Sequence, residues 1–243
     1  MKSLSLQTSS IAASMTVSID TLAKKLKAEG KDIVSLGAGE PDFKTPEIIR
    51  NAAKEAIEQG KTKYVAPTGL EEVRKAVVNK LQKENGLSYS ANQIVLTSGA
   101  KQAVFNSLAA LINPDDEIII PAPYWVTYPE LVKWFKGVPV FIETTPESAF
   151  KISPEQLKNA ITEKTKAVIL NNPCNPSGAV YSPKELKALS EVIVDNDLFC
   201  ISDEIYEHFC YETEFASIAS FPDMYERTIL INGFSKSHCM TGW

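Results

Sequence analysis

The sequence predicts an α/β fold, in which a mostly parallel sheet carries helices on both faces. From residue 93 onward, short apolar runs alternate with longer stretches whose apolar residues recur at helical spacing. The apolar runs are continuous rather than interrupted by polar residues, which is typical of strands that are buried on both faces. The expected strands are 93–97, 117–121, 138–142, 166–171, 199–202 and 227–232.

The predicted helices follow from capping signals and from apolar spacing. Thr45 as the cap and Pro46 in the first turn predict the start of the first of them. The second carries apolar residues three or four positions apart, and the others each follow one of the expected strands. The expected helices are 46–59, 69–85, 101–112, 128–135, 154–161 and 182–196.

Composition narrows the class of protein. The chain has 243 residues and a formal net charge of −5, which argues against nucleic acid or an anionic membrane as the main partner. It has four cysteines, none at CxxC spacing, and two histidines, so we expect no metal site and no disulfide framework. This cysteine usage fits a reducing compartment, and a cytoplasmic location is expected. The Ser-rich start lacks arginine and a solid apolar segment, and no cleaved signal is expected.

Most of the reactive side chains follow the ends of predicted strands. In open α/β sheets, ligands bind outside the carboxyl ends of the strands. Segments that are distant in the sequence are therefore expected to meet at one rim of the sheet. These segments are 98–101, 121–125, 171–175, 203–206 and 233–236.

Each of these segments offers a different chemistry. Gly99 and Ala100 open a helix, whose free backbone N–H groups suit a phosphate, although an ordinary capped turn has the same pattern. Asp203 can keep a ring nitrogen protonated, or it can serve as a helix cap or a surface ion pair. Lys236 can form a Schiff base in a partly desolvated cleft, or it can be a solvated loop lysine. Trp125 offers a flat face for ring stacking, or it packs in the core.

Together these features fit one ligand better than they fit separate structural roles. A planar ring with a phosphate, an aldehyde and a basic nitrogen would use all of them. Pyridoxal 5'-phosphate (PLP) is such a molecule, and it acts as an electron sink.

Seven motifs carry a resemblance to a known family. In the order of these motifs and in their residues, the sequence resembles the class I, fold-type I aminotransferases, and most of all the bacterial-type aspartate aminotransferases. The motifs are GAGEPDF (37–43), GKTKYVAPTG (60–69), SGAKQAVFN (98–106), PAPYWVTYP (121–129), NNPCNPSGAVY (171–181), SDEIYEH (202–208) and NGFSKSHCMTGW (232–243).

The resemblance implies roles for the residues around the cofactor ring. Lys236 matches the lysine that forms the internal aldimine and later moves the proton. Asp203 matches the carboxylate that pairs with the pyridinium nitrogen. Tyr206 and Asn175 match the groups that hydrogen-bond to the phenolic oxygen, and Trp125 matches the residue that stacks on the ring.

The resemblance also implies a phosphate cradle and a dimer. Gly99, Ala100, Lys101 and Ser235 match the residues that surround the phosphate. Tyr64 matches a tyrosine that reaches the phosphate of the neighbouring subunit. A homodimer with shared active sites is therefore expected.

The substrate follows from the same resemblance. Lys101, with hydroxyls near Ser14 and Thr16, resembles a site that receives an acidic side chain. The expected reaction converts L-aspartate and 2-oxoglutarate to oxaloacetate and L-glutamate. Three alternatives stay open: an aminotransferase for prephenate, aromatic or alanine-like substrates, another PLP enzyme such as a lyase on this fold, or a catalytically silent PLP-binding module. The positions that match amino-acid contacts are Gly39, Lys101, Trp125 and Asn175.

The resemblance finally implies a domain organisation. Residues 1–45 are expected to form an N-terminal arm and part of a small domain, and residues 46–243 a large PLP-binding domain that is incomplete at its C-terminal end. Family members continue into an arginine that binds the phosphate, a C-terminal small domain, and an arginine that binds the substrate carboxylate. The chain is therefore expected to be part of a longer protein, and to be poorly stable and inactive by itself.

Overall fold

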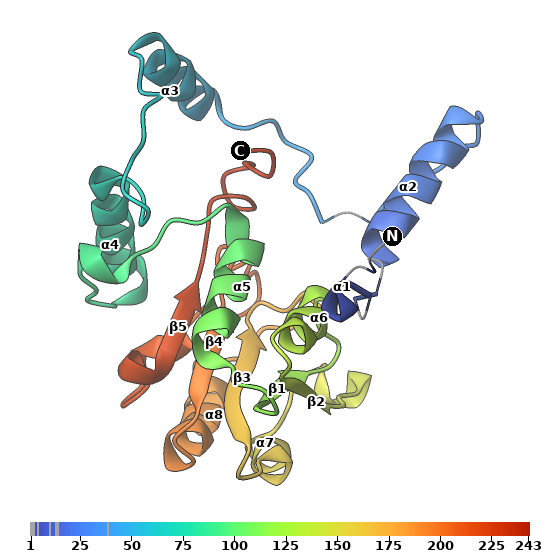
Figure 1. Ribbon diagram of the computed structural model, residues 1–243, viewed down its shortest axis with the longest axis vertical. Helices are drawn as coiled ribbons and strands as arrows, with labels where there is room; N and C mark the ends of the chain where they lie inside the picture. Colours follow the sequence, from blue (N-terminus) through green and yellow to red (C-terminus); the bar gives the residue numbers. More distant parts are fainter. Residues whose placement is uncertain (1–2, 4, 10, 13–14, 38) are drawn as a thin grey trace.

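A single parallel sheet forms the centre of the molecule. The computed structural model describes residues 3, 5–9, 11–12, 15–37 and 39–243. The strands of the sheet lie in the order β2-β1-β3-β4-β5, and every neighbouring pair is parallel (Figure 1). The expected α/β class with a parallel sheet is confirmed. The strands are β1 (Glu117–Pro121), β2 (Val138–Ile142), β3 (Thr165–Asn171), β4 (Phe199–Asp203) and β5 (Thr228–Ile231).

Helices cover the sheet and extend from it. Six of them overlap the six ranges that the sequence predicts, with ends that differ by at most two residues. The helices are α1 (Leu6–Ser9), α2 (Met15–Ala28), α3 (Glu47–Glu58), α4 (Glu71–Asn85), α5 (Gly99–Leu111), α6 (Thr127–Trp134), α7 (Pro154–Ala160) and α8 (Pro183–Asp195). Short 3-10 turns are η1 (Ala91–Gln93), η2 (Pro146–Ser148), η3 (Ile218–Ser220) and η4 (Tyr225–Arg227).

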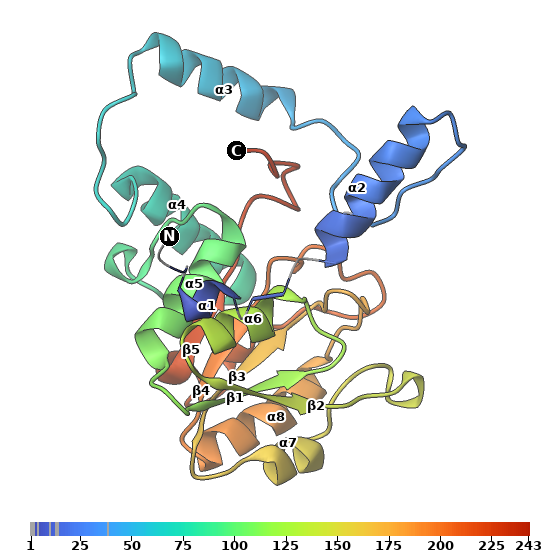
Figure 2. The same cartoon turned by 45° about the vertical axis from the view of Figure 1, so that its right-hand side comes forward.

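The two faces of the sheet are buried under different helices. On β1, Ile118 and Ile120 pack in the cluster that includes residues of α5 and α6. Ile119, between them, packs in the cluster that includes residues of α7 and α8. Successive side chains of a strand point to opposite faces, so a strand that is covered on both sides needs an unbroken apolar run. Figure 2 shows α5 and α6 on one side of the sheet and α7 and α8 on the other.

Local sequence signals explain where α8 begins. The Ser182 side chain accepts a hydrogen bond from the backbone N–H of Glu185, and the Glu185 carboxylate accepts one from the backbone N–H of Ser182. This reciprocal capping box satisfies backbone donors that the helix itself leaves free. Pro183 occupies the first helical position, where a missing N–H costs nothing. α7 begins with the same arrangement at Ser153 and Pro154.

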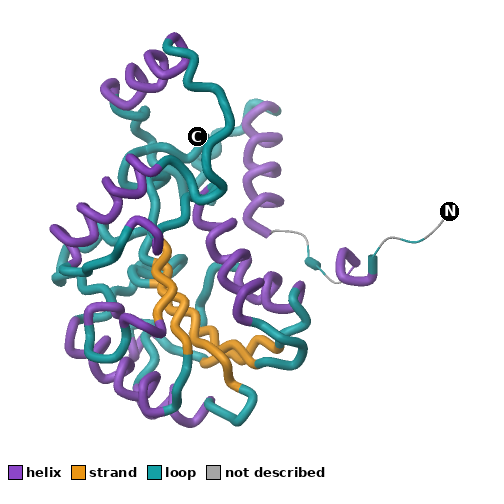
Figure 3. The backbone as a smooth tube through the Cα atoms, turned by 60° about the vertical axis from the view of Figure 1, so that its left-hand side comes forward, coloured by secondary structure: helices purple, strands orange, loops and turns teal. Residues whose placement is uncertain are grey.

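Two helices near the N-terminus, α2 and α3, lie apart from the sheet. Figures 1 and 3 show α2 and α3 standing away from the strands. No residue of α3 is buried. The expected cap of this helix is wrong: Pro46 precedes α3, and the hydroxyl of Thr45 instead donates to the backbone oxygen of Cys239. The hydroxyl donates to a distant carbonyl oxygen instead of accepting from a backbone N–H of the helix, which sequence spacing alone does not reveal.

The predicted strand at 93–97 is also wrong. Residues 91–93 form η1, and Ile94 continues in an extended conformation. The backbone N–H of Leu96 donates to the oxygen of Thr68, at 3.0 Å, in a connection outside the sheet. An apolar run predicts an extended buried segment, but a strand also needs a neighbour to pair with. In the described part of the chain, segment 94–97 has no such neighbour.

Of the helices in the described ranges, none combines the length and the apolar character that a bilayer span needs.

Candidate functional site

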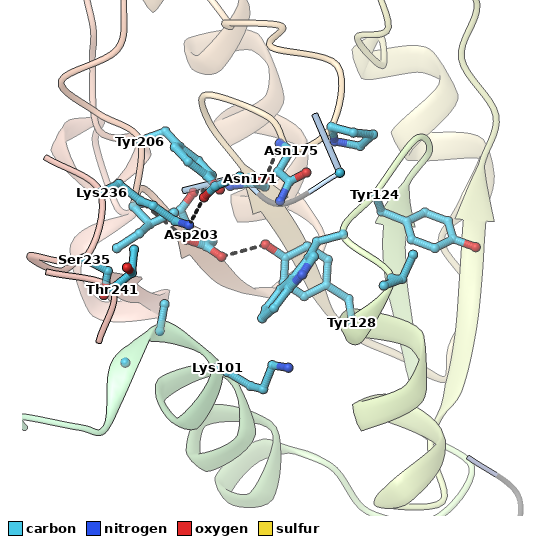
Figure 4. Close-up of a pocket in the computed structure, with 18 residues that line it drawn as sticks. Lys101, Tyr124, Tyr128, Asn171, Asn175, Asp203, Tyr206, Ser235, Lys236 and Thr241 are labelled. Carbon is cyan, nitrogen blue, oxygen red and sulfur yellow. Dashed lines mark hydrogen bonds between the residues drawn. The ribbon is translucent and has the colours of Figure 1, made fainter. Parts of the chain in front are cut away.

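A cavity of about 580 Å³ opens at the carboxyl ends of the strands (Figure 4). Its walls come from the turns after β1, β3, β4 and β5, from the start of α5, and from the arm before α3. Parallel strands end at the same edge of a sheet, so the predicted convergence is observed. The predicted site residues that line the cavity are Gly39, Gly99, Ala100, Lys101, Trp125, Asn175, Asp203, Tyr206, Ser235 and Lys236.

One wall of the cavity is the first turn of α5. Gly99 begins this helix with φ of 77°, a left-handed conformation that favours glycine. A Cβ atom at Gly99 would meet nothing within 4 Å, so the backbone there is open to a ligand. Free N–H groups and the positive end of the helix dipole attract an anion. Lys101 adds a cation, with its ammonium 5.3 Å from the centroid of the Trp125 ring.

Asp203 is the buried acid of the site. Its side chain is 3% exposed and accepts hydrogen bonds from the Tyr128 hydroxyl, at 2.6 Å, and from the backbone N–H of Ile205, at 3.2 Å. Burial raises the pKa of Asp203, while these two hydrogen bonds act in the opposite direction. No lysine, arginine or histidine in the described residues forms an ion pair with it. A buried carboxylate without a cation calls for a cationic ligand.

Tyr206 and Asn175 lie together beside Asp203. Burial raises the pKa of the Tyr206 hydroxyl, the charge of Asp203 adds to the rise, and a side-chain hydrogen bond with Asn175 opposes it. Tyr206 therefore keeps its proton at neutral pH. Both side chains can donate to an oxygen on a bound ring.

Lys236 reaches into the same cavity from the turn after β5. Its ammonium donates to the backbone oxygen of Gly39 and lies 5.9 Å from the centroid of the Tyr206 ring. Burial lowers the pKa of Lys236, and the nearby charge of Glu40 opposes this effect. A lysine with a lowered pKa is more often neutral and therefore more nucleophilic.

One residue singled out in the sequence lies outside the cavity lining, and two others are not described well enough to place there. Tyr64 lies between α3 and α4 with a fully exposed side chain, outside the cavity lining. Ser14 lies outside the described residues. Thr16 belongs to α2, and its side chain is not described.

Sequence reasoning missed two side chains that support the site. Asn171 donates to the backbone oxygen of Asp203 at 2.9 Å and accepts from the backbone N–H of Asn175 at 2.7 Å. It therefore ties the end of β3 to the end of β4. Tyr128, which holds Asp203, follows Trp125 by three residues. Its position inside the motif PAPYWVTYP, just beyond the strand-end segment 121–125, was the available signal, but its partner is 75 residues away.

One cluster of two glutamates and a histidine lies outside the cavity lining. The ligand atoms of Glu84, Glu207 and His208 lie within 4.8 Å of one another, which the sequence spacing did not indicate. Lys80 already forms ion pairs with both carboxylates. The group is therefore a compensated ion-pair network.

Comparison with known proteins gives the class of this chain. Residues 31–243 match the family model described as aminotransferase class I and II. The match covers most of the sequence, and the chain belongs to this family.

Individual relatives narrow the comparison. The chain is 47% identical to an aspartate aminotransferase of Bacillus subtilis and 45% identical to an aspartate/prephenate aminotransferase of Thermus thermophilus. It aligns over 99% and 100% of its own length, and spans 62% and 63% of theirs. The solved structure of the Thermus thermophilus aspartate aminotransferase with maleate superimposes with a TM-score of 0.97 at 45% identity, covering 100% of this chain and 63% of that one.

Proposed function

We propose that this chain is the PLP-binding part of an aminotransferase that transfers the amino group of L-aspartate to 2-oxoglutarate, with Lys236 as the lysine that holds the cofactor. One observation carries the proposal. The buried carboxylate of Asp203, which lacks a cationic partner in the described residues, shares one cavity with Lys236 and with the open start of α5.

The residues of this cavity fit PLP. Gly99, Ala100 and Ser235 would hold the phosphate at the start of α5, where a Cβ atom at Gly99 would meet nothing within 4 Å. Asp203 would pair with the ring nitrogen and keep it protonated. Trp125 would stack on the ring.

The reaction then needs one group that moves a proton. When bound, PLP supplies an electron sink for the charge that develops on the substrate Cα. Lys236 removes the proton from Cα, and its lowered pKa makes it a better base near neutral pH. Tyr206 and Asn175, whose side chains are hydrogen-bonded to each other, would donate to the ring oxygen and hold the ring in place. Gly39, whose backbone oxygen Lys236 contacts, lies where the amino acid would enter.

The preference for a dicarboxylic substrate rests on Lys101. Its ammonium faces the cavity and offers a partner to an acidic side chain. The names of the Bacillus and Thermus relatives support aspartate as the substrate, and the name of the Thermus relative supports prephenate as a second substrate. Aromatic or alanine-like substrates and a PLP lyase remain the alternatives.

Assembly and organisation complete the proposal. The exposed ring of Tyr64 would reach the phosphate of a second subunit in a homodimer, and the enzyme would act in the cytoplasm. Residues 1–45 would form the arm and part of a small domain, and residues 46–243 the large PLP-binding domain.

Borohydride labelling tests the cofactor and its anchor. The protein is incubated with PLP, reduced, digested and mapped by mass spectrometry. Borohydride converts the link between a lysine and the cofactor into a stable secondary amine. We expect the phosphopyridoxyl group on the peptide that contains Lys236. A label spread over exposed lysines, at the level seen with a denatured sample, would contradict the proposal.

Replacing Lys101 by methionine tests the substrate. We expect kcat/KM for aspartate to fall about tenfold or more relative to that for alanine, because only aspartate loses a charged partner. Lys166→Met is the matched control, since this ammonium also lies over an aromatic ring, at 6.0 Å from the Phe199 centroid, but at the opposite end of the sheet. An equal loss for both amino acids would assign Lys101 to the phosphate alone.

A further inference from the structure

Tyr128 contacts two other residues of the cavity wall, Asp203 and Trp125. It lies in the first turn of α6 and is 2% exposed. Its hydroxyl donates to Asp203, and its ring packs edge-on against Trp125, with centroids 5.3 Å apart and an interplanar angle of 88°. Its backbone N–H also donates to the oxygen of Trp125, at 3.0 Å. Figure 4 shows Tyr128 beside the cavity with its hydroxyl turned toward Asp203.

The hydroxyl of Tyr128 is a permanent donor. Burial raises its pKa well above the ordinary value, and the charge of Asp203 adds to this rise. Tyr128 therefore keeps its proton around neutral pH, and its hydrogen bond favours the ionised form of Asp203. The backbone N–H of Ile205 occupies the other carboxylate oxygen and leaves little freedom for rotation.

Other titratable groups lie near the hydrogen-bonded pair of Tyr128 and Asp203. Tyr206 follows β4, Lys236 follows β5, and Cys174 lies in the loop after β3, near Tyr128. In the described structure, neither Tyr206 nor Cys174 donates a hydrogen bond to the Asp203 carboxylate. Lys236 donates instead to the backbone oxygen of Gly39.

We propose that Tyr128 is a positioning residue, whose hydroxyl fixes the orientation and the charge of Asp203 toward the cofactor ring while its ring edge sets the plane of Trp125. The inference rests on the proposed function, because it deepens the role given there to Asp203. No motif of the sequence assigns this role to Tyr128. Two sides of the same ligand, its nitrogen and its stacking face, would thus depend on one buried side chain.

The first test needs no cofactor. In the ligand-free protein labelled with ¹³C-aspartate, the infrared carbonyl band of protonated Asp203 is followed against pH and assigned by its absence from Asp203→Ala. Loss of a hydrogen bond to a charged group should raise the titration midpoint by about one to two pH units in Tyr128→Phe. An unchanged midpoint overturns the inference.

Tyr181→Phe is the matched control. Its hydroxyl is also buried, and it accepts a hydrogen bond from the backbone N–H of Ile152 on the other side of the sheet. Both variants are expected to lose stability through a lost buried hydrogen bond. Only Tyr128→Phe should shift the titration of Asp203, and a shift of similar size in Tyr181→Phe would overturn the inference.

The second test is a double-mutant cycle on PLP binding, measured by equilibrium dialysis. We expect Tyr128→Phe to raise the dissociation constant of PLP about tenfold in the wild-type background. In an Asp203→Ala background the same change should alter it by about twofold at most, because the partner is gone. An equal effect in both backgrounds would make Tyr128 a packing residue and overturn the inference.

The two proposals fail in different ways. A protein that takes no borohydride label on Lys236 contradicts the proposed function, and the infrared titration still decides whether Tyr128 controls Asp203. A protein that is labelled on Lys236, with a Tyr128→Phe variant that titrates and binds PLP as the wild type does, contradicts only the role of Tyr128.

Discussion

Under the proposed function, replacing Lys236 by alanine is expected to lower the rate of transamination about 10²–10⁴-fold, the range typical of losing a positioned acid–base group. The methyl group of alanine can neither remove the proton from Cα nor return it. The side chain is also the one that reaches from the turn after β5 toward Gly39 and Tyr206, so no neighbouring lysine of the described cavity takes its place at that point. Steady-state kinetics with aspartate and 2-oxoglutarate measure the loss.

Rescue by a small amine distinguishes the loss of a catalytic group from a loss of folding in the Lys236→Ala variant. Methylamine or ethylamine in the buffer should restore part of the rate of Lys236→Ala, because it can occupy the emptied space and accept the proton. Lys184→Ala, which removes a lysine of α8 far from the cavity lining, should keep the wild-type rate. A Lys236→Ala enzyme with unchanged kcat would assign the proton transfer to another group.

Replacing Glu204 by glutamine is expected to make the protein increasingly more stable than the wild type as the pH rises above about 5. Glu204 follows Asp203 and is 1% exposed. One carboxylate oxygen accepts hydrogen bonds from Ser202 and Ser217, both at 2.8 Å. Burial raises the pKa of Glu204 from 4.5 to about 8, against the lowering effect of the two serines. Glutamine keeps an oxygen for both serines and carries no charge.

The sign of the pH effect follows from proton binding. Between about pH 5 and pH 8, Glu204 is protonated in the folded protein and ionised in the unfolded chain. The folded state then binds more protons, so the free energy of unfolding falls as pH rises, by up to about 1.4 kcal/mol per unit. Over this range the wild type should lose of the order of 4 kcal/mol relative to Glu204→Gln. Asp203 is present in both proteins, and its own titration cancels in the comparison.

Urea denaturation at several pH values measures this difference. At about pH 5 the two proteins should have similar free energies of unfolding, and the gap should widen toward pH 8. Glu71→Gln is the control, because the pKa of this exposed carboxylate is lowered by Lys75 and its titration lies outside the range. Parallel stability curves for Glu204→Gln and the wild type would show that Glu204 is ionised in the folded protein.

The sequence was a good guide wherever the physical cause is local. Continuous apolar runs predicted β1 to β5, since a strand covered on both faces has no solvent-exposed face that would carry polar residues. The order of strands and helices predicted α8, and the structure shows that the adjacent Ser182 and Pro183 form its start. Strand-end chemistry predicted the cavity, because parallel strands all end at one edge.

The errors occurred where the partner is distant. Segment 94–97 has the composition of a strand, but pairing depends on a neighbour that composition does not contain. Thr45 has the residue type of a helix cap, but its hydroxyl meets Cys239 across the molecule. In both cases a tertiary contact overrides a local preference.

The sequence by itself therefore determined the class of fold, the rim that holds the site, and the residue types gathered there, because these follow from periodicity and from the direction of parallel strands. Only the tertiary structure decided that Tyr128 donates to Asp203, that Asn171 joins two strand ends, and that Glu204 is buried with its charge suppressed. Hydrogen bonds and desolvation act over a few ångströms, and the folded chain alone brings residues so far apart in sequence to that distance.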